Sequence, residues 1–178
     1  MESIKIKDKE FSLSIPAEQI NRAVCNIAEK INKEYNGKDP VFLVILNGAF
    51  MFAADLFKEL TIQCEVSFVK LASYAGIKTT EVVKTIIGLN EDIRGKSIII
   101  VEDIVDTGNT IEDITESLNK LGPDEVKICT MLFKPGAYRK NIKIDYIGVE
   151  IPNDFIVGHG LDYDGFGRNL TDIYKIVE

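Results

Sequence analysis

The sequence predicts an α/β domain with a central, largely parallel sheet flanked by helices. Apolar runs of strand length recur along the chain, and segments with the apolar spacing of a helix separate several of them. The chain has 178 residues, 46% of them hydrophobic, and it contains no internal repeat or linker rich in Pro, Gly and Ser. This length is enough to bury one hydrophobic core. We therefore expect a single domain over residues 1–178.

Local patterns define the first elements. A short alternating segment at the N-terminus precedes residues 14–37, which have a proline near the start, a glycine at the end and apolar residues spaced by four, three and four positions. That spacing predicts an amphipathic helix. Residues 40–46 are continuously apolar, which predicts a buried strand, and residues 47–60 are typical of a turn and a second helix.

The second half of the chain continues the alternation. Residues 64–73 and 82–89 are typical of strands separated by a polar stretch. Residues 97–101 and 125–133 predict two further strands around a helix at 110–122. Loops and helix N-termini converge outside the carboxyl ends of the strands in such sheets, so ligands bind there.

Three acids gather at one of these carboxyl ends. We expect the strand to close at Val101 and residues 102–109 to form a loop that carries Glu102, Asp103 and Asp106. Like charges this close repel and raise each other's pKa, so the arrangement costs stability unless a ligand or cation offsets it. The cluster therefore predicts a binding site.

Residues 106–110, with the sequence DTGNT, allow two interpretations. A glycine for close backbone approach, two threonine hydroxyls and the free amides of a helix N-terminus favour an anion such as phosphate. The alternative is an ordinary helix start, in which Asp or Thr caps the helix and Gly makes the turn. The preceding acids favour a phosphorylated sugar, whose hydroxyls the carboxylates would bind while a divalent cation screens the charge.

Composition excludes several classes of partner. The formal net charge of −7 and the absence of a dense Lys/Arg run argue against nucleic acid and against membranes. Residues 1–11 are too charged for a signal peptide, and no apolar run approaches the ~20 residues that span a bilayer. Cys25, Cys64 and Cys129 are odd in number and far apart, which we interpret as buried thiols in a reducing compartment. We expect a soluble, cytoplasmic protein.

The run IIIVEDIVDTGNT closely resembles the signature of the phosphoribosyltransferases that bind phosphoribosyl pyrophosphate. Further segments resemble the hypoxanthine-guanine branch of that family in order and spacing: LNGAF at 46–50, LASYAG at 71–76, LFKP at 132–135 and VEIPNDFIVGHGLDYDGFGRNL at 149–170. The resemblance covers residues 40–175. It implies the type I phosphoribosyltransferase fold, with a small hood formed by the N- and C-terminal segments.

The resemblance also implies an activity, a cofactor and an assembly. A 5-phosphoribosyl group would pass from phosphoribosyl pyrophosphate to hypoxanthine or guanine in purine salvage, giving IMP or GMP and pyrophosphate. The implied cofactor is Mg²⁺, and the implied assembly is a homodimer or homotetramer.

The matched binding loop implies the roles that concern the sugar phosphate. Glu102 and Asp103 would hold the ribose hydroxyls, and Asp106 would act as the general base near the purine N7. The alternative for Asp106 is an acid that only caps the helix. The implied 5'-phosphate cradle consists of Asp106, Thr107, Gly108, Asn109 and Thr110.

Other matched positions imply the purine-binding residues. Lys134 resembles the lysine that donates to the purine 6-oxo group, Phe155 the aromatic residue that stacks on the ring, and Ile156 the residue whose carbonyl faces position 2. Asp162 belongs to the same implied purine-binding set, and it resembles the acid that contacts Mg²⁺ through water. Glu102 and Asp103 are the other acids implied to bind the metal. Without the resemblance, the plainer interpretations are a surface lysine beside a Pro-Gly turn and a core phenylalanine.

The implied pyrophosphate site consists of Asn47, Gly48 and Arg168, with a cis peptide between Leu46 and Asn47. Asn47 stands where relatives often carry Lys or Arg, so its side chain brings no charge to the site. Ser73 and Tyr74 resemble the tip of a mobile loop that closes over the site. His159, the single histidine, replaces an aromatic residue, and we expect it to pack beneath its segment without a catalytic task.

Two rival functions stay open. A xanthine-preferring enzyme would share the phosphate loop and differ only near purine position 2, which the sequence does not resolve. A non-catalytic regulator on the same fold would sense nucleotides and bind RNA, which requires a basic face. The acidic balance of the chain argues against the regulator.

Overall fold

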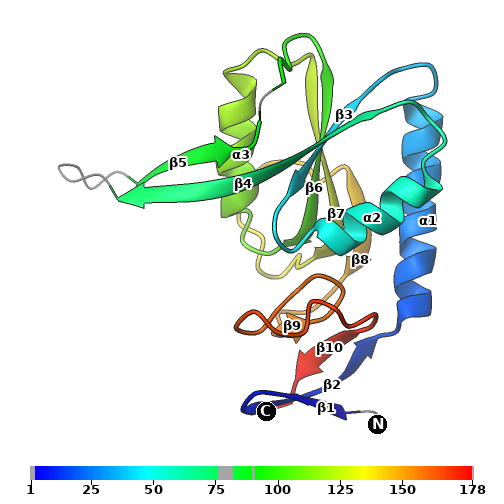
Figure 1. Ribbon diagram of the computed structural model, residues 1–178, viewed down its shortest axis with the longest axis vertical. Helices are drawn as coiled ribbons and strands as arrows, with labels where there is room; N and C mark the ends of the chain where they lie inside the picture. The colour runs from blue at the N-terminus through cyan, green and yellow to red at the C-terminus, as the bar shows by residue number, and fades with distance from the viewer. Residues whose placement is uncertain (1–2, 76–81, 90, 178) are drawn as a thin grey trace.

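The computed structural model describes residues 3–75, 82–89 and 91–177, and six strands form its main sheet in the order β5-β4-β3-β6-β7-β8 (Figure 1). All neighbours in the sheet are parallel except β4 and β5, which are antiparallel. The bounds are Val41–Ile45 (β3), Glu65–Ala75 (β4), Val82–Ile87 (β5), Ser97–Val105 (β6), Glu125–Phe133 (β7) and Tyr146–Glu150 (β8). The predicted α/β architecture with a largely parallel sheet is confirmed.

Helices cover both faces of this sheet. Helices α1 (Ala17–Glu34) and α2 (Phe50–Glu59) pack on one face, where they share a core with Phe42 and Val44 of β3. Helix α3 (Asn109–Asn119) packs on the other face. Successive residues of a strand point to opposite faces, so a strand buried on both sides is apolar at every position. This explains the continuous apolar run of β3, in which all five residues are buried.

A second, smaller sheet forms the predicted hood from the two ends of the chain. Its strands are antiparallel in the order β1-β2-β10-β9, and Figure 1 shows it below the main sheet. Phe11, Val157 and Tyr174 form its core. The bounds are Ser3–Ile6 (β1), Lys9–Ile15 (β2), Ile156–Val157 (β9) and Ile173–Ile176 (β10).

Strand β6 is longer than the sequence suggests. We expected it to close at Val101, but it runs to Val105, and Glu102 pairs with Thr130 of β7. The strand continues through the acids because β7 extends equally far and offers backbone partners up to its last residue. Glu102 and Asp103 therefore lie on the end of a rigid strand rather than in a loop.

Other local predictions need correction. Of the three cysteines, only Cys129 is buried; Cys64 is partly buried and Cys25 is exposed on α1. Cys25 lies between the buried residues Val24 and Ile27, on a side of the helix that the core does not cover. Strand β8 was not predicted, because its residues Tyr146–Glu150 include a glycine and follow a charged, irregular stretch.

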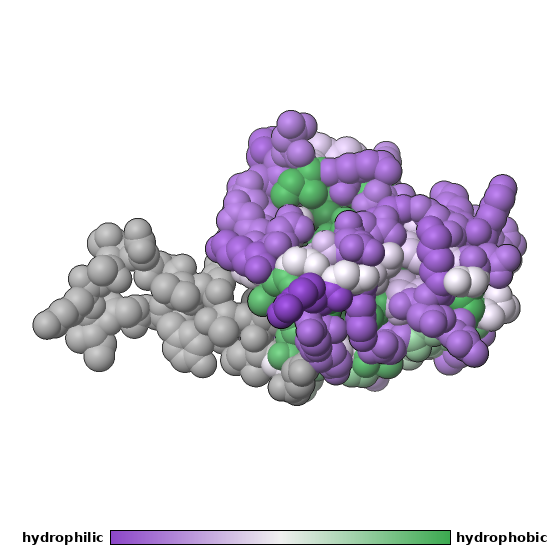
Figure 2. All heavy atoms as spheres, turned by 90° about the horizontal axis from the view of Figure 1, so that it is seen from above, coloured by the Kyte–Doolittle hydropathy of each residue, from purple (hydrophilic) through white to green (hydrophobic). Residues whose placement is uncertain are grey.

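The face of the molecule seen from above is mostly hydrophilic. In the view from above, apolar atoms gather only in small areas among hydrophilic ones (Figure 2). Within the described parts of the chain, no helix is both long enough and apolar enough to cross a membrane.

Candidate active site

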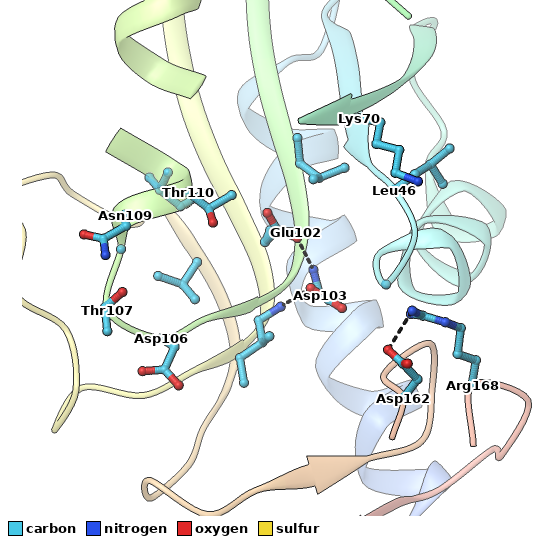
Figure 3. A pocket seen from close by; sticks show the side chains of 16 residues that line it. Leu46, Lys70, Glu102, Asp103, Asp106, Thr107, Asn109, Thr110, Asp162 and Arg168 are labelled. Carbon is cyan, nitrogen blue, oxygen red and sulfur yellow. Dashed lines mark hydrogen bonds and ion pairs between the residues drawn. The ribbon is translucent and has the colours of Figure 1, made fainter. Parts of the chain in front are cut away.

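A pocket of about 470 Å³ opens at the carboxyl ends of β3 and β6 (Figure 3). The β6–α3 loop forms one side, and the hood contributes residues to the other. This is the edge at which the sequence predicts a site. The charged residues that line it are Lys70, Glu102, Asp103, Asp106, Asp162 and Arg168.

The segment between β6 and α3 has the geometry of an anion cradle. Gly108 adopts a left-handed backbone conformation with φ of 88°, and a Cβ there would lie 2.5 Å from the Tyr138 ring. Only glycine fits both constraints. Helix α3 begins at the next residue, so its first amides face the pocket. Thr107, Asn109 and Thr110 are exposed and line the same pocket.

Two acids lie at the floor of the pocket, Glu102 buried and Asp103 partly buried. Glu102 is 7% exposed, and its Oε2 has no hydrogen-bond partner within the described parts of the chain. Burial, and then the charge of Asp103, raise the pKa of Glu102 well above its usual range. Burial also raises the pKa of Asp103, although its Oδ1 accepts a hydrogen bond from the Ile104 amide at 2.8 Å. Glu102 Oε2 is therefore available to accept a hydrogen bond from a ligand hydroxyl or to coordinate a cation.

Asp106 and Lys134 form an ion pair at the ends of adjacent parallel strands. Lys134 Nζ donates to Asp106 Oδ2 at 2.8 Å, and the Lys134 amide donates to the Val105 carbonyl at 3.0 Å. The Lys134 side chain is largely buried, whereas that of Asp106 is 46% exposed. The plain interpretation of Lys134 as a surface residue is therefore wrong. Lys134 itself is not among the residues that line the pocket.

The turn after β3 packs closely on the acidic floor. The Leu46–Asn47 peptide is cis, as the resemblance implies. A Cβ at Gly48 would lie 1.5 Å from Asp103 Oδ2, so the turn touches the floor only because residue 48 is glycine. Leu46 and Gly48 line the pocket; the Asn47 side chain is exposed and does not.

The hood side of the pocket carries a satisfied ion pair. Arg168 Nη2 lies 2.6 Å from Asp162 Oδ1, and Arg168 Nη1 donates to the Gly160 carbonyl at 2.6 Å. The other carboxylate oxygen of Asp162 accepts from the Gly165 amide at 2.6 Å. Figure 3 shows this pair across the pocket from Asp106 and Thr107. Arg168 thus points at the pocket while its charge is already paired.

The predicted purine-stacking residue lies on the hood. Phe155 is 47% exposed, with Phe11 at 6.4 Å and Tyr163 at 6.0 Å between ring centroids, the latter edge-to-face. These rings fix one side of Phe155 and leave its other side open to solvent. Its neighbour Ile156 is buried on β9. Neither residue lines the acidic pocket.

His159 connects the hood to the main sheet. It is 5% exposed, and its Nε2 lies 3.0 Å from Asp55 Oδ2 of α2. Burial raises the pKa of Asp55, but hydrogen bonds from Lys58 and His159 outweigh it and hold that pKa below its usual value. His159 thus packs beneath its segment as expected, and its contact with α2 is an addition from the structure.

Ser73 and Tyr74, the two residues predicted to form the tip of a mobile loop, lie near the end of β4. The backbone of Ser73 and Tyr74 forms part of β4, paired with β5, rather than the tip of a loop. Residues 76–81, next to this predicted segment, lie outside the described residues. The role of this segment stays a prediction.

Lys70 is a pocket residue that the sequence analysis missed. It stands on β4 and its side chain reaches the pocket beside Leu46 (Figure 3). The available signal was the alternation of β4: Val69 is buried, so Lys70 must face the opposite way. Lys70 follows directly after Val69, the last residue of β4 that pairs with β3 before the cis turn.

Glu102, Asp103 and Asp162 could bind a divalent cation only if a bound substrate supplied further oxygen ligands. Across residues 3–75, 82–89 and 91–177, no group of three or more His, Cys, Asp or Glu is arranged to hold an ion. Glu102, Asp103 and Asp162 therefore do not form one cluster by themselves. The orphaned oxygen of Glu102 beside Asp103 does suit Mg²⁺, which proteins commonly bind through one or two carboxylates plus substrate phosphates.

Comparison with known proteins identifies the class. The sequence model of the "Phosphoribosyl transferase domain" matches residues 16–164. The chain therefore belongs to the phosphoribosyltransferase family, in agreement with the acidic strand end and the glycine-containing helix start.

Individual relatives narrow this family. The chain is 40% identical to hypoxanthine phosphoribosyltransferase of Escherichia coli K12 over 92% of this chain and 93% of that protein. It is 36% identical to the hypoxanthine-guanine phosphoribosyltransferase of Mycobacterium tuberculosis H37Rv over 91% and 84%. A crystal structure of the Staphylococcus aureus hypoxanthine phosphoribosyltransferase superposes with a TM-score of 0.84 at 33% identity, covering 99% of this chain and 98% of that one. Within the family, the chain belongs to the hypoxanthine-guanine branch.

Proposed function

We propose that this protein transfers the 5-phosphoribosyl group of phosphoribosyl pyrophosphate to hypoxanthine or guanine, giving IMP or GMP and pyrophosphate in purine salvage. The observation that carries this proposal is the Asp106–Lys134 pair, 2.8 Å apart beside the glycine-containing start of α3. It brings together an acid for the purine N7 proton, a buried amine for the 6-oxo oxygen and an anion cradle for the sugar phosphate.

The 5'-phosphate binds to the cradle formed by residues 106–110. The left-handed Gly108 and the first amides of α3 provide donors directed at an anion. A hydrogen bond from the Arg139 amide to the Thr107 carbonyl at 3.2 Å holds the loop in place. The phosphate thus meets a preformed site whose neutral donors cost little reorganisation.

The ribose hydroxyls bind to Glu102 and Asp103. Glu102 Oε2 has no hydrogen-bond partner among the described residues, and burial raises the pKa of both acids. Mg²⁺, held by these carboxylates together with oxygens of the sugar diphosphate, would screen the negative charge of the leaving group. Asp162 would meet the cation from the hood side. As the C1–pyrophosphate bond breaks, the anionic floor stabilises the oxocarbenium character of the ribose.

The purine binds between the hood and Lys134. Lys134 donates to the 6-oxo oxygen, Phe155 stacks on the ring with its open face, and the Ile156 carbonyl faces position 2. Asp106 accepts the N7 proton as general base. A 6-amino group would leave the buried Lys134 donor unpaired, which disfavours adenine.

Pyrophosphate binds between Arg168 and the amides of Asn47 and Gly48. The planar guanidinium suits two phosphate oxygens at once. Closure of the segment that contains Ser73 and Tyr74 would exclude water from the reacting sugar.

We further propose that the enzyme is a cytoplasmic homodimer or homotetramer. Phe50 of α2 and Val66 and Phe68 of β4 are 41%, 46% and 49% exposed, and Val66 and Phe68 point to the same face of their strand. A contact with a second subunit would cover these side chains. The three free cysteines suit a reducing compartment. Sedimentation equilibrium of the wild type and of Phe68→Lys tests the assembly: a monomeric wild type would refute it.

The test of the proposed function is pyrophosphate release by the purified protein. Phosphoribosyl pyrophosphate and Mg²⁺ are incubated with hypoxanthine, guanine, xanthine, adenine or uracil in separate reactions. We expect release with hypoxanthine and guanine and at most traces with adenine and uracil. Strong turnover of xanthine would assign the protein to the xanthine-preferring rival, since that specificity depends on contacts at position 2. No turnover, with nucleotide-dependent binding of RNA, would favour the regulator.

A further inference from the structure

The pocket has an imbalance of charge. Among the described residues, four acids and two cations line it: Glu102, Asp103, Asp106, Asp162, Lys70 and Arg168. A sugar diphosphate adds several further negative charges. Cations that are free to pair with it therefore have a large effect on its binding.

The two cations differ in how far they are already paired. Arg168 is held by Asp162 at 2.6 Å and by the Gly160 carbonyl, so a diphosphate must compete with an acid for it. Lys70 is exposed and has no carboxylate within 4.0 Å among residues 3–75, 82–89 and 91–177. Lys134, which does not line the pocket, is paired with Asp106. Of the two cations that line the described part of the pocket, Lys70 is thus the one that is not already paired.

The position of Lys70 is fixed by the turn that packs on the floor. The amide of Leu46 donates to the carbonyl of Val69 at 2.8 Å, so the residue that follows Val69 lies next to the cis turn. The turn itself, residues 46–48, contains no cation. Figure 3 shows the Lys70 side chain beside Leu46, on the side of the pocket that holds Arg168.

We infer that Lys70 is a further substrate-binding residue, which supplies from β4 the positive charge for the diphosphate that the neutral turn at Asn47 does not provide. This inference rests on the proposed function and adds a residue to its diphosphate site. Lys70 pairs with diphosphate oxygens in the bound state, when Arg168 alone would leave the added charge uncompensated.

The first test replaces the charge and keeps the length of the side chain. Lys70→Met should raise the KM for phosphoribosyl pyrophosphate about 10-fold, and the apparent Kd for inorganic pyrophosphate in the presence of Mg²⁺ by a similar factor, as expected for a lost charge-assisted contact. The KM for hypoxanthine should change less than twofold. Because a charge has been removed, the salt dependence of the KM for phosphoribosyl pyrophosphate should also weaken. Lys30→Met, on the exposed side of α1, is the matched control and should change none of these values.

The second test places a positive charge on the turn at residues 46–48 in place of the charge of Lys70. In the Lys70→Met background, Asn47→Lys should recover most of the lost affinity for phosphoribosyl pyrophosphate and restore the salt dependence. A purely structural role of Lys70 predicts no such rescue. An active wild type with an unchanged KM in Lys70→Met, or a defect that Asn47→Lys does not relieve, would overturn the inference. An inactive wild type that nevertheless binds pyrophosphate with a Lys70-dependent Kd would instead refute the transferase proposal and keep the binding role.

Discussion

On the sheet side of the pocket, the buried Glu102 and the partly buried Asp103 have no ion-pair partner among the described residues, whereas on the hood side Asp162 pairs with Arg168 at 2.6 Å. The two sides therefore respond differently to a ligand. The floor gains hydrogen bonds from any ligand that brings donors. The hood must give up an existing ion pair before Arg168 can bind an anion. This difference predicts that floor variants and hood variants fail in different ways.

The largest effect is expected at the reacting end of the sheet side. Asp106→Asn keeps the size of the side chain and an oxygen that can accept from Lys134, but removes the general base. We expect kcat to fall by roughly 10²-fold or more while the affinity for phosphoribosyl pyrophosphate stays nearly intact. Steady-state kinetics with hypoxanthine, together with a binding titration of phosphoribosyl pyrophosphate, measure both values. Unchanged turnover would remove Asp106 from the catalytic role.

A hood variant should instead lose affinity for the diphosphate. Arg168→Ala removes the guanidinium and leaves Asp162 as an uncompensated negative charge that repels the ligand. The KM for phosphoribosyl pyrophosphate should rise by about 30-fold, because a bidentate charged contact and a favourable field are lost together. In the double variant Arg168→Ala/Asp162→Asn, part of this loss should be recovered. If the two variants have equal KM values, the ion pair has no influence on the pocket.

Lys134 tests the contribution of the sheet side to base choice. Lys134→Met keeps an apolar stem in the buried position and removes the donor. We expect the KM for hypoxanthine to rise about 10-fold and the preference for hypoxanthine over adenine to shrink by a similar factor. Competition of the two bases in one reaction, with product separation, measures that preference. A variant with wild-type affinity and preference would remove Lys134 from the purine site.

The smallest effect is on stability, and its sign depends on pH. Because folding raises the pKa of Glu102, the folded chain binds a proton more tightly than the unfolded chain, so the free energy of unfolding falls as pH rises above the usual glutamate value of 4.5. Glu102→Gln removes this penalty. Without ligand, its Tm at pH 8 should exceed that of the wild type by about 2–4 °C, the shift that 1 kcal/mol gives at this size. The difference should vanish near pH 4.

Glu116→Gln, an exposed acid on α3, is the control for this experiment and should leave Tm unchanged at both pH values. A Glu102→Gln variant that is less stable than the wild type at pH 8 would show that the acid is satisfied without a ligand.

The sequence predicts most of the architecture because its main elements have strong local patterns. The buried strand β3 and the amphipathic helix α1 are where the apolar spacing places them, and the acids of β6 do gather at the carboxyl edge. The predicted end of β6 at Val101 was wrong. Polar residues usually indicate a loop, but here the neighbouring strand β7 provides backbone pairing through Val105. Nothing in the residues of β6 alone carries that information.

The residues of the candidate site also fall into two groups: those that a local motif places at the pocket and those that only the fold places there. Asp106 and Gly108 belong to a contiguous motif and could be assigned from the sequence. Lys70 could not, since its place in the pocket depends on the pairing of β4 with β3 and on which face of β4 points to the cis turn. The ion-pair partners of Arg168 and Lys134 could not be predicted from the sequence either. Asp162 and Asp106 come into contact with them only when the hood and the sheet have formed.

The most direct measurement is a calorimetric titration of phosphoribosyl pyrophosphate with Mg²⁺ into the wild type and into the double variant Glu102→Gln/Asp103→Asn. If the acidic floor exists to bind the ribose, the variant should bind about 100-fold more weakly, the loss expected for two charged hydrogen bonds of ~1.5 kcal/mol each. The unliganded variant should nevertheless be at least as stable to heat as the wild type. Equal affinity of the two proteins would contradict the account, because the buried acids would then cost stability without contributing to the binding of the sugar.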